Sequence, residues 1–302
     1  MNDFADFQNA YDTKRSGYSA GFAIGIGLNV IYVVVEVIYG LRVNSSALLA
    51  DAGHNASDVL SLVLSWVAIY LATKRPFGKY TYGLRKTTIL AAALNGILII
   101  LAGTLILSET IQKLRYPVEI PGDIIMKVAG VGIVVNTITA LLFIKGQKKD
   151  LNIKGAFLHM AADAAVSAGV LAGGFIIKHT GAYWIDSLLS FVIVAVIFLS
   201  AKALLVDSFK LSVDAVPKEI DLEKVRYFLC RVEGVKQVHD LHIWALSTTE
   251  TCLTAHLVVP EGCDDAFLYH IREMLFKEFH IKHSTLQVQS SFVENEYEYH
   301  PV

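Results

Sequence analysis

Two short stretches of this chain place imidazole and carboxylate groups within otherwise apolar sequence. The stretch "ADAGHNASD" contains Asp51, His54 and Asp58, and the stretch "AFLHMAADAA" contains His159 and Asp163. Residues three or four positions apart share one face of a helix. Each stretch, folded as a helix, would point an imidazole and a carboxylate toward the same side. Two such helices facing each other would form a site for a cation.

The types of these ligands indicate which cation would bind. Two histidines and two aspartates offer two nitrogen and two oxygen atoms, which matches the tetrahedral preference of Zn²⁺, with bonds of about 2.0–2.2 Å. Mg²⁺ and Mn²⁺ favour six oxygen ligands and fit less well because two imidazoles are present. We therefore predict a Zn²⁺ site with four ligands: His54, Asp58, His159 and Asp163.

The elements that carry these residues are predicted to be membrane-spanning helices. The chain of 302 residues is 54% hydrophobic and 18% charged, whereas a soluble domain has about 25% charged residues. A helix needs about 20 mostly apolar residues to cross the hydrocarbon core of a lipid bilayer. Six stretches meet this length, at residues 18–41, 47–73, 87–107, 124–144, 156–177 and 183–205. We expect an N-terminal segment over 1–17 and an all-α transmembrane domain of six helices over 18–207.

Lysine and arginine residues indicate how these spans are oriented. Within residues 1–207, most of them fall in three segments, 14–15, 74–86 and 145–154, which six spans would place on the same side of the membrane. Positively charged loops lie mainly in the cytoplasm, so both termini are expected to be cytoplasmic. The N-terminal residues are polar and acidic and lack the basic-then-apolar order of a secretory signal peptide.

The sequence after the sixth span is typical of a soluble domain, over residues 208–302, on the cytoplasmic side. Amphipathic periodicity predicts two helices, with Asp221 as a suitable N-cap of the first, and alternating apolar residues predict three strands. The expected elements are helix 222–232, strand 235–247, strand 251–259, helix 264–280 and strand 284–292. The fold class is thus a six-helix membrane domain followed by an α/β domain of order α-β-β-α-β.

Charged groups inside the membrane indicate function, because each costs at least about 2.5–3.5 kcal/mol at the bilayer centre. Asp51 has two interpretations: it accepts a hydrogen bond from a ligand imidazole, or it lies near the outer membrane interface. Glu36 and Asn95 either line an aqueous cavity or bridge helices, and bridging is the favoured interpretation for Asn95. Asp186, near the start of the sixth span, is expected at the membrane interface.

Several classes of protein are excluded or disfavoured by composition and motif. A net charge of −2 gives no reason to expect a nucleic-acid partner. The three cysteines form no CxxC pair, so neither a disulfide framework nor a thiolate zinc site is indicated. An intramembrane metalloenzyme is disfavoured because the chain has no HExxH motif and four protein ligands leave no coordination position for water. A transporter, a metal-gated channel and a metal sensor remain open.

At these residues the chain resembles the cation diffusion facilitator family, in particular the zinc-transporting branch with HxxxD in both the second and fifth spans. The matching stretches are "SSALLADAGHNASDVLSL", "KYTYGLRKTTILAAALNG", "NIKGAFLHMAADAAVSAGV" and "GVKQVHDLHIWALS". The resemblance implies a homodimeric exporter of Zn²⁺, driven by inward proton flow, in a bacterial inner membrane. Cd²⁺ and Co²⁺ are expected as further substrates. An exporter of Fe²⁺ or Mn²⁺ is the rival within this class, and the paired histidines argue against it.

The resemblance also implies a metallochaperone-like, dimerising cytoplasmic domain that binds further zinc. His239, His256 and His270 match family ligand positions there. The chain departs from the family pattern at Gln289, where an acidic ligand is common and a neutral amide binds zinc poorly. Two alternatives follow: zinc bridges the two protomers in this domain, or the domain dimerises through its apolar surface without metal.

Overall fold

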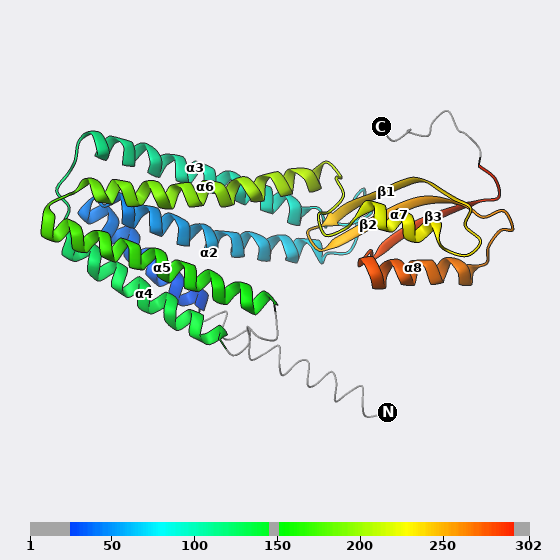
Figure 1. Cartoon of the computed structure of the whole chain (residues 1–302), viewed down its shortest axis with the longest axis horizontal. Helices are drawn as coiled ribbons and strands as arrows, with labels where there is room; N and C mark the ends of the chain where they lie inside the picture. The colour runs from blue at the N-terminus through cyan, green and yellow to red at the C-terminus, as the bar shows by residue number, and fades with distance from the viewer. Residues whose placement is uncertain (1–24, 145–150, 293–302) are drawn as a thin grey trace, which may run out of the picture. The chain divides into compact units, whose positions relative to one another are not determined.

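The computed structural model describes residues 25–144 and 151–292 (Figure 1). The expected N-terminal segment 1–17 and the expected start of the first span lie outside these residues. The chain divides into two compact units, one built on the residues up to Val63 with Asn95–Lys202, the other on Leu64–Leu94 with the residues from Ala203 onward. Each unit is described by itself below.

Within residues 25–144 and 151–292, six helices are long and apolar enough to cross a membrane, which confirms the expected all-α membrane domain. They are the first helix Gly25–Val43, α2 Ser46–Ala72, α3 Thr87–Arg115, α4 Gly122–Phe143, α5 Leu151–Thr180 and α6 Trp184–Ser212. Helix α3 continues past its expected end at 107, because the first helix-breaking residue after it is Pro117. Helix α6 continues to Ser212, past the expected boundary at 207 between the membrane domain and the soluble domain. That boundary stays a prediction.

Large apolar side chains cover the outer faces of these helices. Trp66, Leu105 and Leu199 are 70%, 74% and 69% exposed. Exposed apolar surface of this kind is stable against lipid and costly against water. A soluble helical protein would bury these residues, so the pattern supports the assignment of membrane spans.

Helices α4 and α5 lie side by side and approach closely at two glycines (Figure 1). A Cβ atom at Gly122 would collide with the carbonyl oxygen of Gly174, and a Cβ atom at Gly174 would meet the carbonyl oxygen of Gly122. Small residues at such positions allow helix backbones to pack tightly within a membrane. This contact helps to fix α5, which carries one of the two predicted imidazole–carboxylate pairs.

A polar bridge also joins α2 and α3. Asn95 Nδ2 donates a hydrogen bond to Ser61 Oγ at 2.5 Å. This contact confirms the helix-bridging interpretation of Asn95.

The N-terminus of α2 is held by a side chain from α6. Asp186 accepts hydrogen bonds from Ser45 Oγ (2.5 Å) and from the backbone N–H groups of Ser46 (2.6 Å) and Ala47 (3.3 Å). The first turn of α2 has no acidic residue of its own, so this carboxylate supplies the negative charge that favours a helix N-terminus. Asp186 is 1% exposed; it is a buried cap of α2, where the sequence suggested only an interfacial position.

The soluble domain has the expected element order, α-β-β-α-β. Its elements are α7 Leu222–Cys230, β1 Gln237–Ser247, β2 Glu250–Val258, α8 Asp265–Phe279 and β3 His283–Gln289. Asp221 caps α7 as predicted, since its Oδ1 accepts from the backbone N–H groups of Glu223 and Lys224. In the sheet, β1 pairs antiparallel with β2, and β2 pairs parallel with β3. The core contains Leu229 of α7, Leu257 of β2 and Leu275 of α8, so both helices pack with the sheet.

We predict that Asp186→Ala destabilises the protein, because two buried backbone N–H groups of α2 lose their acceptor. A buried donor left unsatisfied costs about 1–3 kcal/mol, so the thermal unfolding midpoint of the purified protein should fall. Asp123→Ala is the matched control, since Asp123 is a half-exposed aspartate in the first turn of α4. Equal midpoints for the two variants would show that the Asp186 contact does not hold α2.

Candidate metal centre

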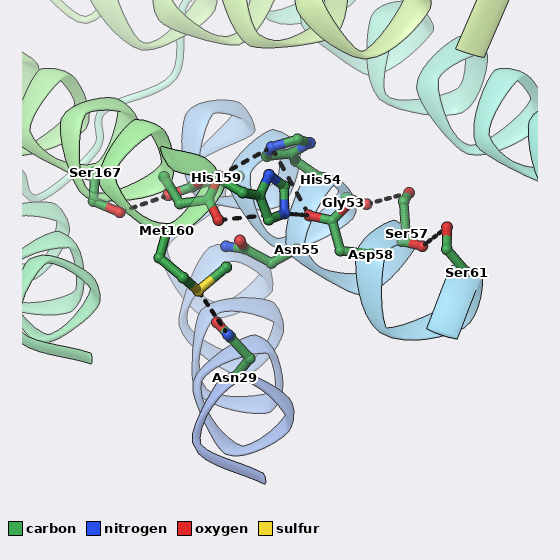
Figure 2. Close-up of polar contacts among 12 residues, drawn as sticks. Asn29, Gly53, His54, Asn55, Ser57, Asp58, Ser61, His159, Met160 and Ser167 are labelled. Atoms are coloured by element: carbon green, nitrogen blue, oxygen red, sulfur yellow. Dashed lines mark hydrogen bonds and ion pairs between the residues drawn. The ribbon is translucent and has the colours of Figure 1, made fainter. Parts of the chain in front are cut away.

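Helices α2 and α5 bring the four predicted ligands to one place. His54 and Asp58 lie one turn apart on α2, and His159 and Asp163 lie one turn apart on α5. Across the two helices, His159 Nε2 lies 3.2 Å from Asp58 Oδ2, and His54 Nε2 lies 3.4 Å from Asp163 Oδ1. Figure 2 shows the side chains of His54, Asp58 and His159 converging. The two HxxxD patterns therefore face each other.

The spacing of these atoms suits a tetrahedral cation. Bonds of 2.0–2.1 Å at tetrahedral angles separate neighbouring ligand atoms by about 3.3 Å. Within each helix, His159 Nε2 lies 3.7 Å from Asp163 Oδ2, and His54 Nε2 lies 4.0 Å from Asp58 Oδ2. Ligand atoms of Asp58, His159 and Asp163 all lie within 4.8 Å of one another. His54 does not belong to this group of three; its Nε2 lies 3.4 Å from Asp163 Oδ1 but 4.0 Å from Asp58 Oδ2.

Both carboxylates keep an oxygen available for a cation. Asp163 is 2% exposed, and its Oδ2, like Asp58 Oδ2, is a buried oxygen whose described neighbours are the imidazoles given above. The contacts with His54 and His159 stabilise these carboxylates only when the imidazole nitrogen carries a proton, because a bare ring nitrogen is itself an acceptor. A buried ionised carboxylate without compensation is costly. The same four groups can therefore be neutralised either by protons on the histidines or by a divalent cation.

Asp51 lies about two turns before Asp58 on α2, and its side chain is buried between helices. It is 1% exposed, and its Oδ2 accepts a hydrogen bond from Ser167 Oγ on α5 at 3.4 Å. Its other oxygen, Oδ1, is buried without a hydrogen-bond partner in the part of the chain that the structure describes. The described hydrogen bonds thus connect Asp51 to a serine hydroxyl and not to a ligand imidazole.

A cavity of about 290 Å³ lies beside the candidate ligands, and Asp58, His159 and Asp163 line it. Liquid water occupies about 30 Å³ per molecule, so this volume has room for several waters. Asn29 of the first helix also lines the cavity, where its Nδ2 lies 3.6 Å from the sulfur atom of Met160.

Asn29, Asn55 and Met160 also line the cavity, and none of them was predicted as a site residue from the sequence. Asn55 and Met160 directly follow the two candidate histidines in the chain. Asn29 shares a helix face with Glu36, because the two are seven residues apart, or about two turns. That spacing of polar residues in an apolar helix was the available signal for the contribution of the first helix.

The soluble domain pairs two of the three histidines that the resemblance suggested. His239 and His256 lie directly opposite on β1 and β2, and their ring centroids are 5.1 Å apart. His239 Nε2 lies 3.2 Å from Gln289 Oε1 on β3, and His256 Nε2 lies 3.5 Å from Asp240 Oδ2. His270 lies on α8, where it lines a hollow together with residues of α7.

Asp240, which no sequence pattern indicated, lies at a bulge of β1 with a φ of 50°. This conformation interrupts the strand between His239 and His242. A β-bulge changes the direction in which a side chain leaves the strand, and bulges are common next to functional sites. The carboxyl of Asp240 contacts His242 at 2.7 Å as well as His256.

Comparison with protein families and known proteins identifies both parts of the chain. Residues 22–211 match the cation efflux transmembrane domain, and residues 217–291 match the cation efflux protein, cytoplasmic domain. The metal cation efflux system protein CzcD of Cupriavidus metallidurans is 33% identical over 90% of this chain and 87% of that protein. The cadmium, cobalt and zinc/H(+)-K(+) antiporter of Bacillus subtilis is 31% identical over 86% of this chain and 85% of that protein.

A solved structure, the metal-bound C-terminal domain of the CzcD transporter from C. metallidurans, is 36% identical. The match covers 23% of the present chain and 99% of the solved domain, with a TM-score of 0.22. The two family matches cover most of the residues, in the same order as the six spans and the soluble domain. This chain is a multi-pass membrane protein that belongs to the cation diffusion facilitator family, the cation efflux proteins.

Proposed function

We propose that this chain exports Zn²⁺ from the cytoplasm in exchange for protons. The observation that carries the proposal is the convergence of two HxxxD pairs, with cross-helix contacts of 3.2 and 3.4 Å, close to the ligand separation of a tetrahedral site. His54, Asp58, His159 and Asp163 are the proposed ligands of one transported Zn²⁺. Cd²⁺ and Co²⁺ are proposed as further substrates, since a site of nitrogen and oxygen ligands does not sharply exclude them. The chain is proposed to act as a transporter and not as an enzyme.

Two features support zinc over harder cations. The paired imidazoles favour Zn²⁺ over Mg²⁺ or Mn²⁺, and the Bacillus subtilis relative is named for cadmium, cobalt and zinc. The same name includes H(+) and K(+), which supports exchange against a monovalent cation. An exporter of Fe²⁺ or Mn²⁺ would need a site with more oxygen ligands than these residues provide.

The proposed exchange follows from competition between protons and metal. Zn²⁺ binds a neutral imidazole and an ionised carboxylate, so metal binding releases protons. Histidine is the side chain whose ordinary charge change falls closest to physiological pH, which suits it to exchange protons. His54 and His159 are proposed to carry exchangeable protons, while Asp58 and Asp163 balance the charge of the cation. Rocking of the helices about the site would expose it to each side in turn.

The chain is proposed to form a homodimer in the inner membrane, with both termini in the cytoplasm. The family that matches residues 217–291 is named for a dimer, which supports dimerisation through the soluble domain. Residues 1–17 form the proposed N-terminal segment, 18–207 the transport domain and 208–302 the dimerisation domain. Next to His239 and His256, strand β3 offers the neutral amide of Gln289 and not a carboxylate. Zinc is therefore proposed to bind weakly at these histidines.

We predict that His159→Ala abolishes uphill zinc transport. The full chain would be reconstituted in liposomes with an imposed pH gradient and a zinc-sensitive dye. Loss of a hydrogen-bonded neighbour of a metal ligand typically lowers metal affinity by about 10–100-fold, and loss of a ligand should lower it at least as much. The matched control is His179→Ala, an exposed histidine on the same helix, which should transport normally.

A protonophore should stop uphill zinc export by the wild-type protein, because the proton gradient is the proposed driving force. The same assay separates the transporter from a channel, which would only dissipate the zinc gradient. Uphill export that persists with the pH gradient collapsed, or equal transport by the two histidine variants, would contradict the proposed function.

We predict that His54→Asp shifts selectivity from Zn²⁺ toward Mn²⁺. The substitution replaces a nitrogen ligand with an oxygen ligand, and oxygen-rich sites favour harder cations. The measurement is competition among Zn²⁺, Cd²⁺ and Mn²⁺ for transport in the same liposomes. An unchanged order of preference would show that His54 is not a ligand.

A further inference from the structure

The end of α2 exposes a stripe of aromatic and basic side chains. Trp66, Tyr70 and Lys74 are spaced four residues apart, and the chain keeps a helical turn up to Lys74, whose N–H donates to the carbonyl oxygen of Leu71. The three side chains therefore share one face. Trp66 and Tyr70 are 70% and 54% exposed, and their rings stack with centroids 6.5 Å apart. Lys74 Nζ lies 4.2 Å from the centroid of the Tyr70 ring and donates a hydrogen bond to its hydroxyl at 2.8 Å.

A tight turn just beyond α2 adds two more exposed rings. Phe77 and Tyr80 pair as an isolated antiparallel bridge, and the N–H of Tyr80 donates to the carbonyl oxygen of Phe77 at 2.9 Å. Gly78 closes the turn with a φ of 53°, a conformation that glycine adopts at no steric cost. The two rings are half-exposed, with centroids 5.2 Å apart. Lys79 lies in the turn between the two aromatic residues, and its side chain is exposed.

Segment 74–86 carries five basic residues and no acidic one. Two of the five contact acidic residues of the same compact unit: Arg85 pairs with Glu250, and Lys86 Nζ lies 2.8 Å from Asp214 Oδ1. Among the described residues, the other three basic side chains are exposed and make no ion pair: Lys74, Arg75 and Lys79. These three cations are therefore available to an anionic ligand, and the exposed rings lie next to them in the chain.

We propose that Lys74, Arg75 and Lys79, with the four aromatic residues beside them, bind the headgroup of an anionic phospholipid. Trp and Tyr side chains concentrate at the membrane–water interface, where headgroups lie. Basic residues directly beside the end of a membrane span attract anionic lipid, and each strengthens binding about fivefold. Ammonium and guanidinium groups donate charge-assisted hydrogen bonds to phosphate oxygens. Lipid binding at this surface is independent of the four proposed metal ligands.

The composition of the surface favours a lipid over other occupants. A free phosphate ion would use the three cations but leave the exposed rings against water, whereas a phospholipid also offers its glycerol and acyl portions to the rings. A second copy of the chain is disfavoured, because a two-fold symmetric contact would set the same positive surface against itself. Like charges across such a contact repel.

The test is quenching of Trp66 fluorescence by brominated lipids in vesicles that contain the full-length protein. Trp184 and Trp244 would be replaced by phenylalanine, so that Trp66 is the reporter. The vesicles contain equal amounts of phosphatidylglycerol and phosphatidylcholine, with bromine on the acyl chains of one lipid or the other. The relative affinity should favour phosphatidylglycerol by about fivefold or more. The triple variant Lys74→Gln, Arg75→Gln, Lys79→Gln should lose this preference.

The matched control is the triple variant Lys218→Gln, Lys224→Gln, Lys277→Gln. It removes the same charge from exposed lysines of the soluble domain and should keep the preference. Salt provides a second measurement that needs no variant at the surface. About 1 M NaCl shortens the Debye length to about 3 Å and should weaken the preference for phosphatidylglycerol, so the question is decided even if the first triple variant does not fold.

Equal lipid preference in the two triple variants, or a preference that salt leaves unchanged, would overturn the inference. Loss of the preference on addition of inorganic phosphate alone would assign the cations to a free anion. If the first triple variant keeps its lipid preference but no longer dimerises, as measured by light scattering, the surface would belong to a contact with a second copy. Each of these results contradicts a phospholipid site.

Discussion

A carboxylate buried between apolar helices needs positive charge beside it, and the arrangement of this membrane domain depends on that requirement. Asp163 is almost fully buried, and Asp58, which is partly exposed, contacts the same His159. Their contacts with two imidazoles can be satisfied in two ways, by protons on the rings or by a cation between them. Because only one of these can hold at a time, the proposed exchange of metal for protons needs no residues beyond these four.

The helices hold this geometry through contacts at some distance from it. Asp186 fixes the N-terminus of α2, and the glycine contact between α4 and α5 sets how closely α5 approaches its neighbour. Sites on rigid elements are positioned more accurately than sites on loops. A helix that moves as a unit can then carry its imidazole and carboxylate together, as alternating exposure to the two sides of a membrane requires.

Much of this organisation could be predicted from the sequence, because it depends on local periodicity. Apolar runs of sufficient length predicted the six spans, and HxxxD spacing predicted which side chains share a helix face. The order of the soluble elements and the Asp221 cap followed from alternation and capping chemistry. All of these features involve residues close together in the chain, so predicting them required no knowledge of how helices pack.

Contacts between distant residues could not be predicted in the same way. The cap of α2 comes from Asp186, and the hydrogen-bond donor to Glu36 is the side-chain amide of Asn55 on another helix. Sequence spacing does not determine which helix faces meet, so these residues could be identified as polar but not assigned partners. The bulge at Asp240 was also missed, because a single residue in a left-handed conformation leaves the strand's apolar alternation nearly intact.

X-ray absorption at the zinc edge tests the central claim most directly. The sample would be the full chain with one equivalent of zinc, in a background where His239 and His256 are replaced so that only the membrane site can contribute. Four nitrogen and oxygen neighbours at about 2.0–2.2 Å, with two imidazole signatures, are expected. Replacement of His159 should then remove one of those signatures. A six-coordinate oxygen environment, or a spectrum that His159→Ala leaves unchanged, would contradict the account.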